Sequence, residues 1–262
     1  MSDLFNEEII SQATHTKWAG KTVHFARETD STNLWGKRAW REEGAGHGEL
    51  FVAEYQSAGR GRFTRRWSAP PDSAITMSIL ICPEFSPQKA PMLTLVMGLS
   101  VAQAVAELGL DVGIKWPNDV VVSRKKICGI LTEMTMKQDK IGCAVIGVGI
   151  NVNMESFPEE MADKATSLYL ERAQVVGLVM KHFEENYERF VQTEDLSGLK
   201  PDYEKMLANL NQPVRVLDQN DPYEGIARGI NAGGELLVER ADGTVEEVNS
   251  GEVSVRGLYS YV

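Results

Sequence analysis

The sequence predicts an α+β fold, in which one sheet with its helices is followed by a small β-barrel. Long apolar runs rich in β-branched residues occur at 127–134 and 141–150, as in central strands. A dense apolar stretch at 90–108 has the length of a buried helix. From Val214 onwards, short alternating runs are separated by turn residues, which predicts the barrel. This change of pattern places a domain boundary near Gln212.

The first part of the chain contains most of the predicted strands and helices. Strands are expected at 22–27, 50–56, 75–81, 112–116, 120–122, 127–134 and 141–150. A helix is expected over 34–43, because residues 30–33 (Asp-Ser-Thr-Asn) can cap its start and Gly44 can stop it. The stretch 90–108 ends at Gly109, a suitable C-cap, so this segment should be a mostly buried helix.

Two more helices precede the barrel. Residues 172–192 place apolar side chains roughly along one stripe, and a shorter helix is expected at 202–210. The barrel strands are expected at 214–217, 226–230, 236–239, 245–248 and 253–258. The predicted domains are therefore residues 1–211 and residues 212–262.

The charge balance narrows the classes of function. The 262 residues include 27 basic and 37 acidic side chains, a formal net charge of −10. Nucleic-acid binding needs concentrated Lys and Arg, so this balance argues against it for the whole chain. The longest uncharged stretch, 90–106, contains Pro91 and is short for a membrane span. The N-terminus lacks a secretory pattern, and we expect a cytoplasmic protein with neither nucleic acid nor membrane as partner.

The cysteines and histidines predict neither a disulfide framework nor a resident metal site. Cys82, Cys128 and Cys143 are not spaced as a CxxC pair, and the four histidines form no HExxH or HxH pattern. The cysteines are therefore expected to be buried thiols in a reducing compartment.

An arginine-rich loop interrupts this acidic chain directly after a predicted strand. It reads Gly59-Arg60-Gly61-Arg62-Phe63-Thr64-Arg65-Arg66-Trp67. Glycines let the backbone approach a ligand, and guanidinium groups are permanently charged forks for phosphate or carboxylate. The loop is not a Walker motif, because GxxxxGK[ST] is absent, and no helix is expected directly after it. A solvated basic turn is the alternative interpretation.

Three further segments carry side chains suited to a site. Lys115-Trp116-Pro117-Asn118-Asp119 ends a predicted strand, where an amide and a carboxylate can point into a cleft. Lys126 is the last charge before the apolar run Ile127-Cys128-Gly129-Ile130-Leu131. Gly147-Val148-Gly149-Ile150-Asn151-Val152-Asn153 has small residues that let a flat group lie against a central strand. Tight packing or solvation is the alternative interpretation of each segment when it is taken alone.

In this order the motifs resemble the catalytic domain of biotin protein ligases. The resemblance covers roughly residues 27–153, and KWPND combined with GRGR and a tryptophan is highly specific. The β-rich end, with Ser250-Gly251-Glu252-Val253, is similar to the SH3-like C-terminal domain of that family. The resemblance implies a mixed sheet backed by helices, a fold shared with lipoate ligases, followed by the SH3-like barrel.

The resemblance also implies roles for individual residues. The biotin site falls on Ser31, Thr32, Asn33, Gln56, Arg60, Gly61, Arg62 and Lys126. The ATP and adenylate site falls on Arg60, Arg65, Trp67, Lys115, Asn118, Asp119, Gly129 and Asn151. The implied catalytic residues are Arg62, Lys126 and Asp119, and Asp119 could orient or deprotonate the acceptor lysine.

The implied reaction joins biotin to a protein at the expense of ATP. Biotin is activated as biotinyl-5′-AMP and then transferred to a lysine of a biotin carboxyl carrier protein, such as that of acetyl-CoA carboxylase. ATP with Mg²⁺ is the expected co-substrate. The first step brings two anions together, so it needs positive charge and alignment, which Arg60, Arg62 and Lys126 can supply.

This sequence departs from the family pattern in the loop and at the N-terminus. The family usually reads GRGRxGR, whereas Phe63-Thr64 stands here at the second glycine position. Thr64 adopts left-handed conformations less readily than glycine, so a stiffer or differently closed loop is expected. Some members carry an N-terminal helix-turn-helix domain, for which residues 1–21 are too few. We therefore expect a monofunctional ligase without a DNA-binding domain, as a monomer or as a homodimer through a sheet edge.

Three rival functions can be weighed against this interpretation. A lipoate or octanoate ligase on the same fold would need a more apolar tunnel, and the KWPND and GRGR motifs favour biotin. A non-catalytic module that stores biotin or adenylate would have lost Lys126 or the arginines, which are present. A nucleic-acid-binding protein using the arginine loop is disfavoured by the net charge of −10.

Overall fold

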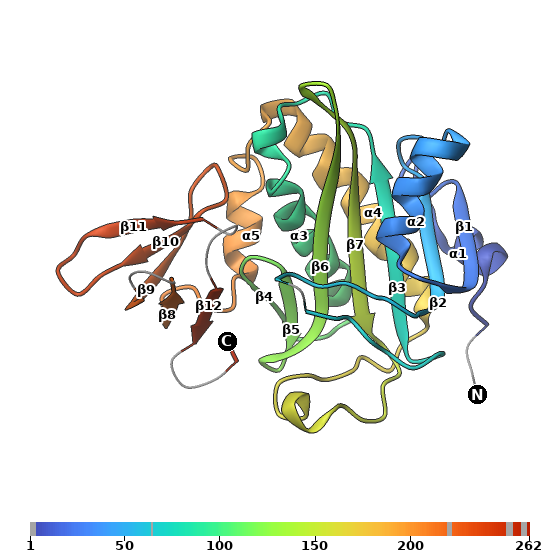
Figure 1. Ribbon diagram of the computed structural model, residues 1–262. Coiled ribbons are helices and arrows are strands. Elements are labelled where there is room, and N and C mark those ends of the chain that lie inside the picture. The colour runs from blue at the N-terminus through green and yellow to red at the C-terminus, as the bar shows by residue number, and fades with distance from the viewer. Residues whose placement is uncertain (1–3, 64, 219–221, 250–253, 258–260) are drawn as a thin grey trace.

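The computed structural model describes residues 4–63, 65–218, 222–249, 254–257 and 261–262. Its main body is a seven-stranded sheet in the order β1-β2-β3-β7-β6-β5-β4 (Figure 1). The strands are β1 (Val23–Thr29), β2 (Leu50–Gln56), β3 (Ala74–Ile81), β4 (Val112–Lys115), β5 (Asp119–Val122), β6 (Lys125–Lys137) and β7 (Lys140–Asn151). β1 and β2 pair in parallel, and each other pair of neighbours is antiparallel. The sheet is therefore mixed, as predicted.

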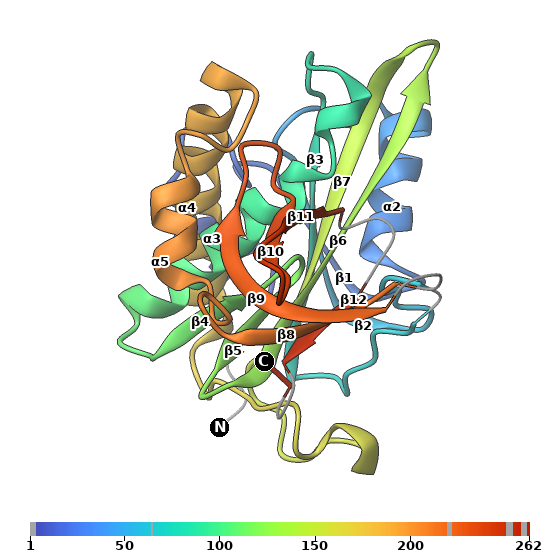
Figure 2. The same cartoon turned by 90° about the vertical axis from the view of Figure 1, so that its left-hand side faces the viewer.

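Helices cover both faces of this sheet (Figure 2). α3 (Met92–Glu107) and α4 (Arg172–Thr193) pack together on one face, with α1 (Glu7–Ala13) beside α4 and α5 (Lys200–Met206) beside α3. α2 (Thr32–Arg38) lies on the opposite face and continues as a π-helical turn over Ala39–Glu43. Short 3-10 turns lie at Pro87–Lys89 and Glu159–Met161.

The main apolar core lies between the sheet and the α3–α4 layer. β3 is buried at all eight of its positions, and Phe183 and Phe190 of α4 are fully buried. Within the described residues, one helix (Pro87–Glu107) has the length and composition of a membrane span, but 72% of its apolar window is buried in the protein. That burial is typical of the core helix of a globular domain. The segment around α3 is thus the buried helix that the sequence predicted.

The helix starts show how local sequence sets the boundaries. At α1, which the sequence analysis did not predict, the Asn6 side chain accepts a hydrogen bond from the Ile9 N–H at 3.0 Å. At α2, Ser31 occupies the N-cap but makes no capping bond through its side chain. Asp30 instead accepts the Ser31 N–H at 2.7 Å and pairs with Arg38 at 2.7 and 2.9 Å. The bond from Arg38 lowers the pKa of Asp30 to about 2.

The helix predicted at 202–210 is wrong at its C-terminal end. α5 ends at Met206, and Leu207 pairs in parallel with Ile114 of the edge strand β4. The Ala208 N–H then donates to the Ile114 carbonyl at 2.9 Å. The edge of the sheet offers unpaired backbone groups, and this tertiary pairing outweighs the helical pattern of the segment.

The second sheet has five antiparallel strands in the order β11-β10-β9-β8-β12. They are β8 (Pro213–Leu217), β9 (Tyr223–Ile230), β10 (Leu236–Glu239), β11 (Val245–Val248) and β12 (Ser254–Gly257). This sheet fits the small SH3-like domain that was predicted. The exact boundary at 211/212 stays a prediction, and the Ser250–Val253 motif lies outside the described residues. The indole N–H of Trp116 donates to the Gly234 carbonyl at 2.9 Å and joins the two sheets.

Glu184 of α4 ties the segment before β1 to the main body. Its carboxylate accepts backbone N–H bonds from Lys17, Trp18 and Ala19 at 2.6–3.0 Å. Burial alone would raise the pKa of Glu184, but these donors outweigh it and hold the pKa below its ordinary value of 4.5. Because the folded pKa lies below the unfolded one, the stabilisation is present above pH ~4.5 and is lost as pH falls through the folded pKa.

The variant Glu184→Gln is therefore expected to lower the free energy of unfolding at pH 7 by about 1–3 kcal/mol, because a neutral amide replaces an ionised acceptor of three donors. Its stability should also change less than that of the parent between pH ~5 and pH ~3. Urea unfolding at both pH values measures each effect. The control is Glu188→Gln, whose carboxylate accepts one bond from the Trp18 indole at 3.2 Å at an exposed position. Equal losses in the two variants would contradict the assignment.

Candidate active site

A cavity of about 730 Å³ lies between the loop after β2, the strands β6 and β7 and the turn before β5. Every residue that the sequence analysis placed in a site lines it: Ser31, Thr32, Asn33, Gln56, Arg60, Gly61, Arg62, Arg65, Trp67, Lys115, Asn118, Asp119, Lys126, Gly129 and Asn151. The sheet explains most of this convergence, because these residues lie at strand ends, in the adjoining loops or on neighbouring strands, while Thr32 and Asn33 lie in the first turn of α2 directly after β1. Their individual roles stay predictions.

The arginine loop folds back on itself and forms one wall of the cavity. The Gly61 N–H donates to the Arg65 carbonyl at 2.8 Å, and the Trp67 N–H donates to the Gly59 carbonyl at 3.1 Å. Gly59 is required here, because a Cβ at this position would lie 2.3 Å from the Trp67 carbonyl oxygen. Phe63 takes a left-handed φ of 52°, which costs a non-glycine residue about 1 kcal/mol. Thr64, whose effect on closure was predicted, lies outside the described residues.

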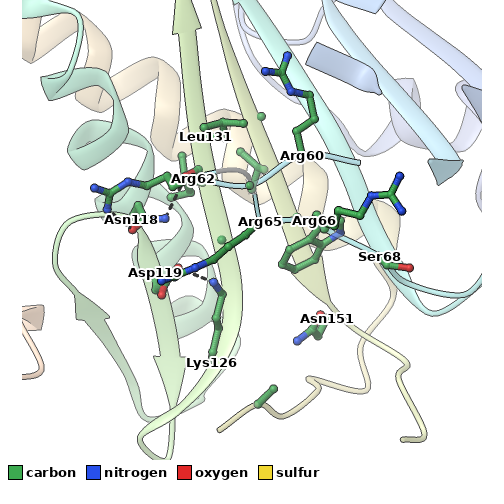
Figure 3. Close-up of a pocket in the computed structure, with 18 of the residues that line it drawn as sticks. Arg60, Arg62, Arg65, Arg66, Ser68, Asn118, Asp119, Lys126, Leu131 and Asn151 are labelled. Atoms are coloured by element: carbon green, nitrogen blue, oxygen red, sulfur yellow. Dashed lines mark hydrogen bonds and ion pairs between the residues drawn. The ribbon is translucent and has the colours of Figure 1, made fainter. Parts of the chain in front are cut away.

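Two arginines anchor this loop to different walls of the cavity. Nη1 of Arg60 lies 3.0 Å from Oε1 of Glu133 on β6. Nη1 of Arg62 donates to Oδ1 of Asn118 at 2.9 Å in the turn before β5, as Figure 3 shows. Burial lowers the pKa of Arg62, although the nearby Asp119 opposes this effect. A half-buried guanidinium that remains charged is a strong site for an anion.

Asp119 and Lys126 form an ion pair within the cavity (Figure 3). Nζ of Lys126 lies 2.6 Å from Oδ1 of Asp119, and their side chains are 20% and 13% exposed. The Tyr261 hydroxyl donates to the other carboxylate oxygen. Burial alone would raise the pKa of Asp119, but Lys126, the Tyr261 bond and Lys115 hold it below its ordinary value. Asp119 is therefore an anion at neutral pH.

The backbone of Lys126 is fixed by a segment for which the sequence predicted no role. Its N–H donates to the Lys164 carbonyl at 2.7 Å, and its carbonyl accepts the Thr166 N–H at 2.9 Å. The same segment, which follows β7, lines the cavity with Phe157 and Met161. The segment has little regular structure and its sequence shows no periodicity. Only its apolar residues, which lie between acidic ones, could have indicated that it lines a cavity. This segment forms part of the cavity wall.

A cluster of hydrogen-bonded side chains forms another part of the cavity wall. Gln56 Oε1 accepts the Thr32 N–H at 2.8 Å. Ser78 Oγ lies 2.7 Å from both Thr32 Oγ1 and Asn33 Oδ1, and was not predicted as a site residue. The Asn33 amide donates to Glu133 Oε2 at 2.8 Å. A buried cluster of this kind presents fixed donors and acceptors to a polar ligand group.

Glu133 connects this cluster to the arginine loop, and the sequence analysis also missed it. Its carboxylate accepts the hydrogen bond from the Asn33 amide and forms the ion pair with Arg60 described above. Lys37 Nζ lies 3.1 Å from its Oε1. Burial alone would raise the pKa of Glu133, but the Asn33 bond and the two cations hold it below its ordinary value. Glu133 lies two residues after Leu131, on the same face of β6, which was the available signal.

Trp67 lies flat against the glycine-rich strands. A Cβ at Gly149 would come within 2.3 Å of the Trp67 ring, and one at Gly129 would come within 3.4 Å of it. The sequence predicted that something flat could lie against this part of β7, and in this structure it is the Trp67 indole. A Cβ at Gly147 would lie 2.3 Å from Asn33 Oδ1. Gly147 and Gly149 of β7 thus make room for site residues.

The cysteine thiols lack the features of activated nucleophiles. The cysteines are unpaired, with Cys128 and Cys143 buried and Cys82 half-buried, and burial raises the pKa of each thiol. Cys82 is thus less buried than predicted. Within the described residues, no group of three or more His, Cys, Asp or Glu side chains is arranged to hold a metal ion.

Comparison with known proteins identifies the family. Residues 25–151 match the Biotin/lipoate A/B protein ligase family, and residues 210–256 match the Biotin protein ligase C terminal domain. The bifunctional ligase/repressor BirA of Bacillus spizizenii is 36% identical over 220 residues, which cover 80% of this chain and 67% of that protein. The chain belongs to the biotin protein ligase family.

Other relatives agree with this assignment. The biotin–[acetyl-CoA-carboxylase] ligase of Mycobacterium tuberculosis is 33% identical over 219 residues, which cover 79% of this chain and 78% of that one. The biotin protein ligase from Aquifex aeolicus in complex with biotin and ATP matches with a TM-score of 0.77 and 32% identity, over 90% of this chain and 99% of that one. The predicted family, fold class and ATP-dependent ligase activity are confirmed. The absence of a DNA-binding domain stays a prediction.

In this ligase the fit between Gly149 and Trp67 is open to a direct test. Gly149→Ala places a Cβ where the indole lies, so we expect Trp67 to be displaced and the free energy of unfolding to fall by about 1–3 kcal/mol. The matched control is Gly98→Ala in α3, where the nearest atom lies at an ordinary 3.7 Å. Thermal unfolding and the indole fluorescence spectrum measure both effects. A Gly149→Ala protein with unchanged stability and fluorescence would show that the packing is not tight.

Proposed function

We propose that this chain activates biotin as biotinyl-5′-AMP with ATP and transfers the biotinyl group to a lysine of a biotin carboxyl carrier domain. One observation carries the proposal: a single cavity contains both a buried hydrogen-bonded cluster and a group of cations. The cluster around Thr32, Asn33 and Gln56 suits the polar ureido group of biotin, which would otherwise bury unpaired atoms. The cations, Arg62 and Lys126 among them, suit the carboxylate of biotin and the phosphates of ATP, which must come together for the reaction.

In the first half-reaction the biotin carboxylate attacks the α-phosphate of ATP, which enters with Mg²⁺ as its counter-ion. The P–O bond to pyrophosphate breaks as the new P–O bond forms. Arg62 and Lys126 would hold these anionic groups together, because two anions do not approach without nearby positive charge. Arg60 and Arg65 extend this positive surface along the loop. The reaction requires neither a nucleophilic side chain nor a protein-bound metal.

In the second half-reaction a neutral lysine amine of the acceptor attacks the acyl carbon, and AMP leaves. Asp119 was predicted either to orient or to deprotonate this lysine. Its lowered pKa and its two occupied oxygens make it a weak base, so they support an orienting role. Asp119→Asn would then slow transfer from preformed adenylate by far less than the 10²–10⁴-fold or so that is typical of a lost base.

The partners follow from the family and the chemistry. The acceptor class is a biotin-accepting carboxylase subunit, and the biotin carboxyl carrier domain of acetyl-CoA carboxylase is the specific acceptor we propose. We also propose a cytoplasmic location. β1 is an outer strand of the sheet, so a homodimer through a sheet edge would place β1 at the interface.

Pyrophosphate exchange into ATP tests the proposal. We expect exchange that depends on biotin and Mg²⁺ without any acceptor protein. Exchange supported by lipoate or octanoate instead would keep the mechanism but overturn the substrate. Tight biotin binding without exchange would leave only a binding module. The polar cluster favours biotin over the two fatty acyl substrates, whose chains have no use for such contacts.

A further inference from the structure

The last described residues of the chain reach into the active site. Tyr261 lines the cavity, and its hydroxyl donates to Oδ2 of Asp119. Nζ of Lys115 lies 3.4 Å from the centre of the Tyr261 ring, a cation–π contact. The carbonyl of Val262 accepts a hydrogen bond from Nη2 of Arg124 at 3.2 Å. These contacts hold the end of the chain against β4, β5 and the turn between β5 and β6.

Tyr261 and Lys126 share the carboxylate of Asp119. Nζ of Lys126 forms an ion pair with Oδ1 at 2.6 Å, and the Tyr261 hydroxyl donates a hydrogen bond to Oδ2. With both oxygens engaged, the carboxylate has one favoured orientation about its terminal torsion, which is otherwise soft. The ammonium group of Lys126 then has one favoured position as well.

The surroundings of Asp119 make this arrangement sensitive to the loss of a donor. Lys115 on β4, Lys126 and Cys128 on β6, and Arg62 in the loop all interact with Asp119. Without the Tyr261 hydroxyl, Oδ2 would lose a donor in a mostly buried place, and the carboxylate would turn toward the remaining cations, Lys115 and Arg62. Lys126 would then shift from its position.

We infer that Tyr261 is a positioning residue for adenylate formation, which acts by holding Asp119 and through it the ammonium group of Lys126. The inference rests on the proposed function. Displacing a charge from a productive geometry by about 1 Å can cost on the order of 10²-fold in rate, whereas substrate affinity depends on many contacts. The loss of this hydroxyl should therefore lower kcat and leave the KM for biotin nearly unchanged.

The variant Tyr261→Phe tests this inference, because it keeps the ring against Lys115 and removes only the hydroxyl. We expect kcat of biotin-dependent pyrophosphate exchange to fall by about tenfold or more, with the KM for biotin within about twofold of the parent. In the Asp119→Asn background the same change should cause no further loss. The matched control is Tyr223→Phe in β9, which lies outside the cavity and keeps its ring against Arg240, 3.8 Å away. Its kcat should be unchanged.

Three results would overturn the inference: an unchanged kcat in Tyr261→Phe, a loss confined to the KM for biotin, or an equal loss in the Asp119→Asn background. The parent protein, assayed in parallel, separates this outcome from failure of the proposed function. If the parent shows no biotin-dependent exchange, then the proposed function fails. If the parent exchanges and Tyr261→Phe matches it, then only the positioning role fails. Thermal unfolding of each variant verifies that the proteins compared are folded.

Discussion

Lys126→Gln is expected to lower the rate of biotin-dependent pyrophosphate exchange by about 10³-fold. Its ammonium group lies 2.6 Å from Asp119, at the wall of the cavity that faces the arginine loop. Its charge is thus mostly buried, held by Asp119 and close to the place where we propose that carboxylate and phosphate meet. A preorganised charge of this kind stabilises a transition state far more than a solvated one, because it needs no reorganisation.

The same substitution should also destabilise the fold, for a separate reason. Without Lys126 the buried Asp119 loses its ion pair, and the effect of burial then raises its pKa. We expect the free energy of unfolding to fall by about 2–3 kcal/mol. In the double variant Lys126→Gln with Asp119→Asn, no unpaired charge remains, so stability should recover while activity does not. Chemical unfolding and exchange kinetics on the same samples separate the two effects.

A neighbouring lysine provides the control for charge and position. Lys125 precedes Lys126 on β6 and does not line the cavity. Lys125→Gln removes the same charge one residue away, on the opposite face of the strand, and should leave exchange within about twofold of the parent. An equal loss in both variants would show that overall charge matters, and not the position of Lys126.

The sequence was sufficient for the site residues that belong to local motifs. The arginine loop follows a strand, and the Pro-Asn-Asp turn lies between two strands, so the sheet alone brings them to one place. Glycines at 147 and 149 were identified as room for a flat group; the Trp67 indole occupies the room at Gly149, and the Asn33 amide occupies the room at Gly147. Each of these inferences needed only the strand periodicity and the chemistry of a few neighbouring residues.

The residues that the sequence missed depend on contacts between distant segments. Tyr261 is separated from Asp119 by 142 positions, and Ser78 from Asn33 by 45. Each belongs to a residue type that is common in strands and tails, so no local pattern marks it. The prediction of the C-terminal end of α5 was wrong for the same reason, because Leu207 pairs with the distant strand β4. Local propensity could not reveal these tertiary partners.

Arg62→Gly is expected to leave adenylate formation largely intact and to let the adenylate escape. The Arg62 guanidinium bridges from the loop to Asn118 at 2.9 Å, so it closes the loop over the cavity. Biotinyl-5′-AMP is a mixed anhydride that reacts with water and with any amine it meets once it leaves the site. Lys126 is still present in this variant, so the ammonium group that contributes most to adenylate formation is retained. The loss should therefore appear mainly in retention of the intermediate and much less in its synthesis.

Two readouts measure this effect: biotin incorporated into a bystander protein that is no natural acceptor, and the rate of pyrophosphate exchange. We expect bystander labelling to rise by tenfold or more, roughly what the loss of one charge-assisted contact allows, while exchange falls much less. The control is Arg66→Gly, which adds a glycine to the same loop but leaves the bridge to Asn118. If Arg66→Gly leaks equally, loop flexibility is the cause and the bridge is not. If Arg62→Gly stops making adenylate, Arg62 acts in the chemical step itself, and Lys126 alone does not supply enough positive charge for it.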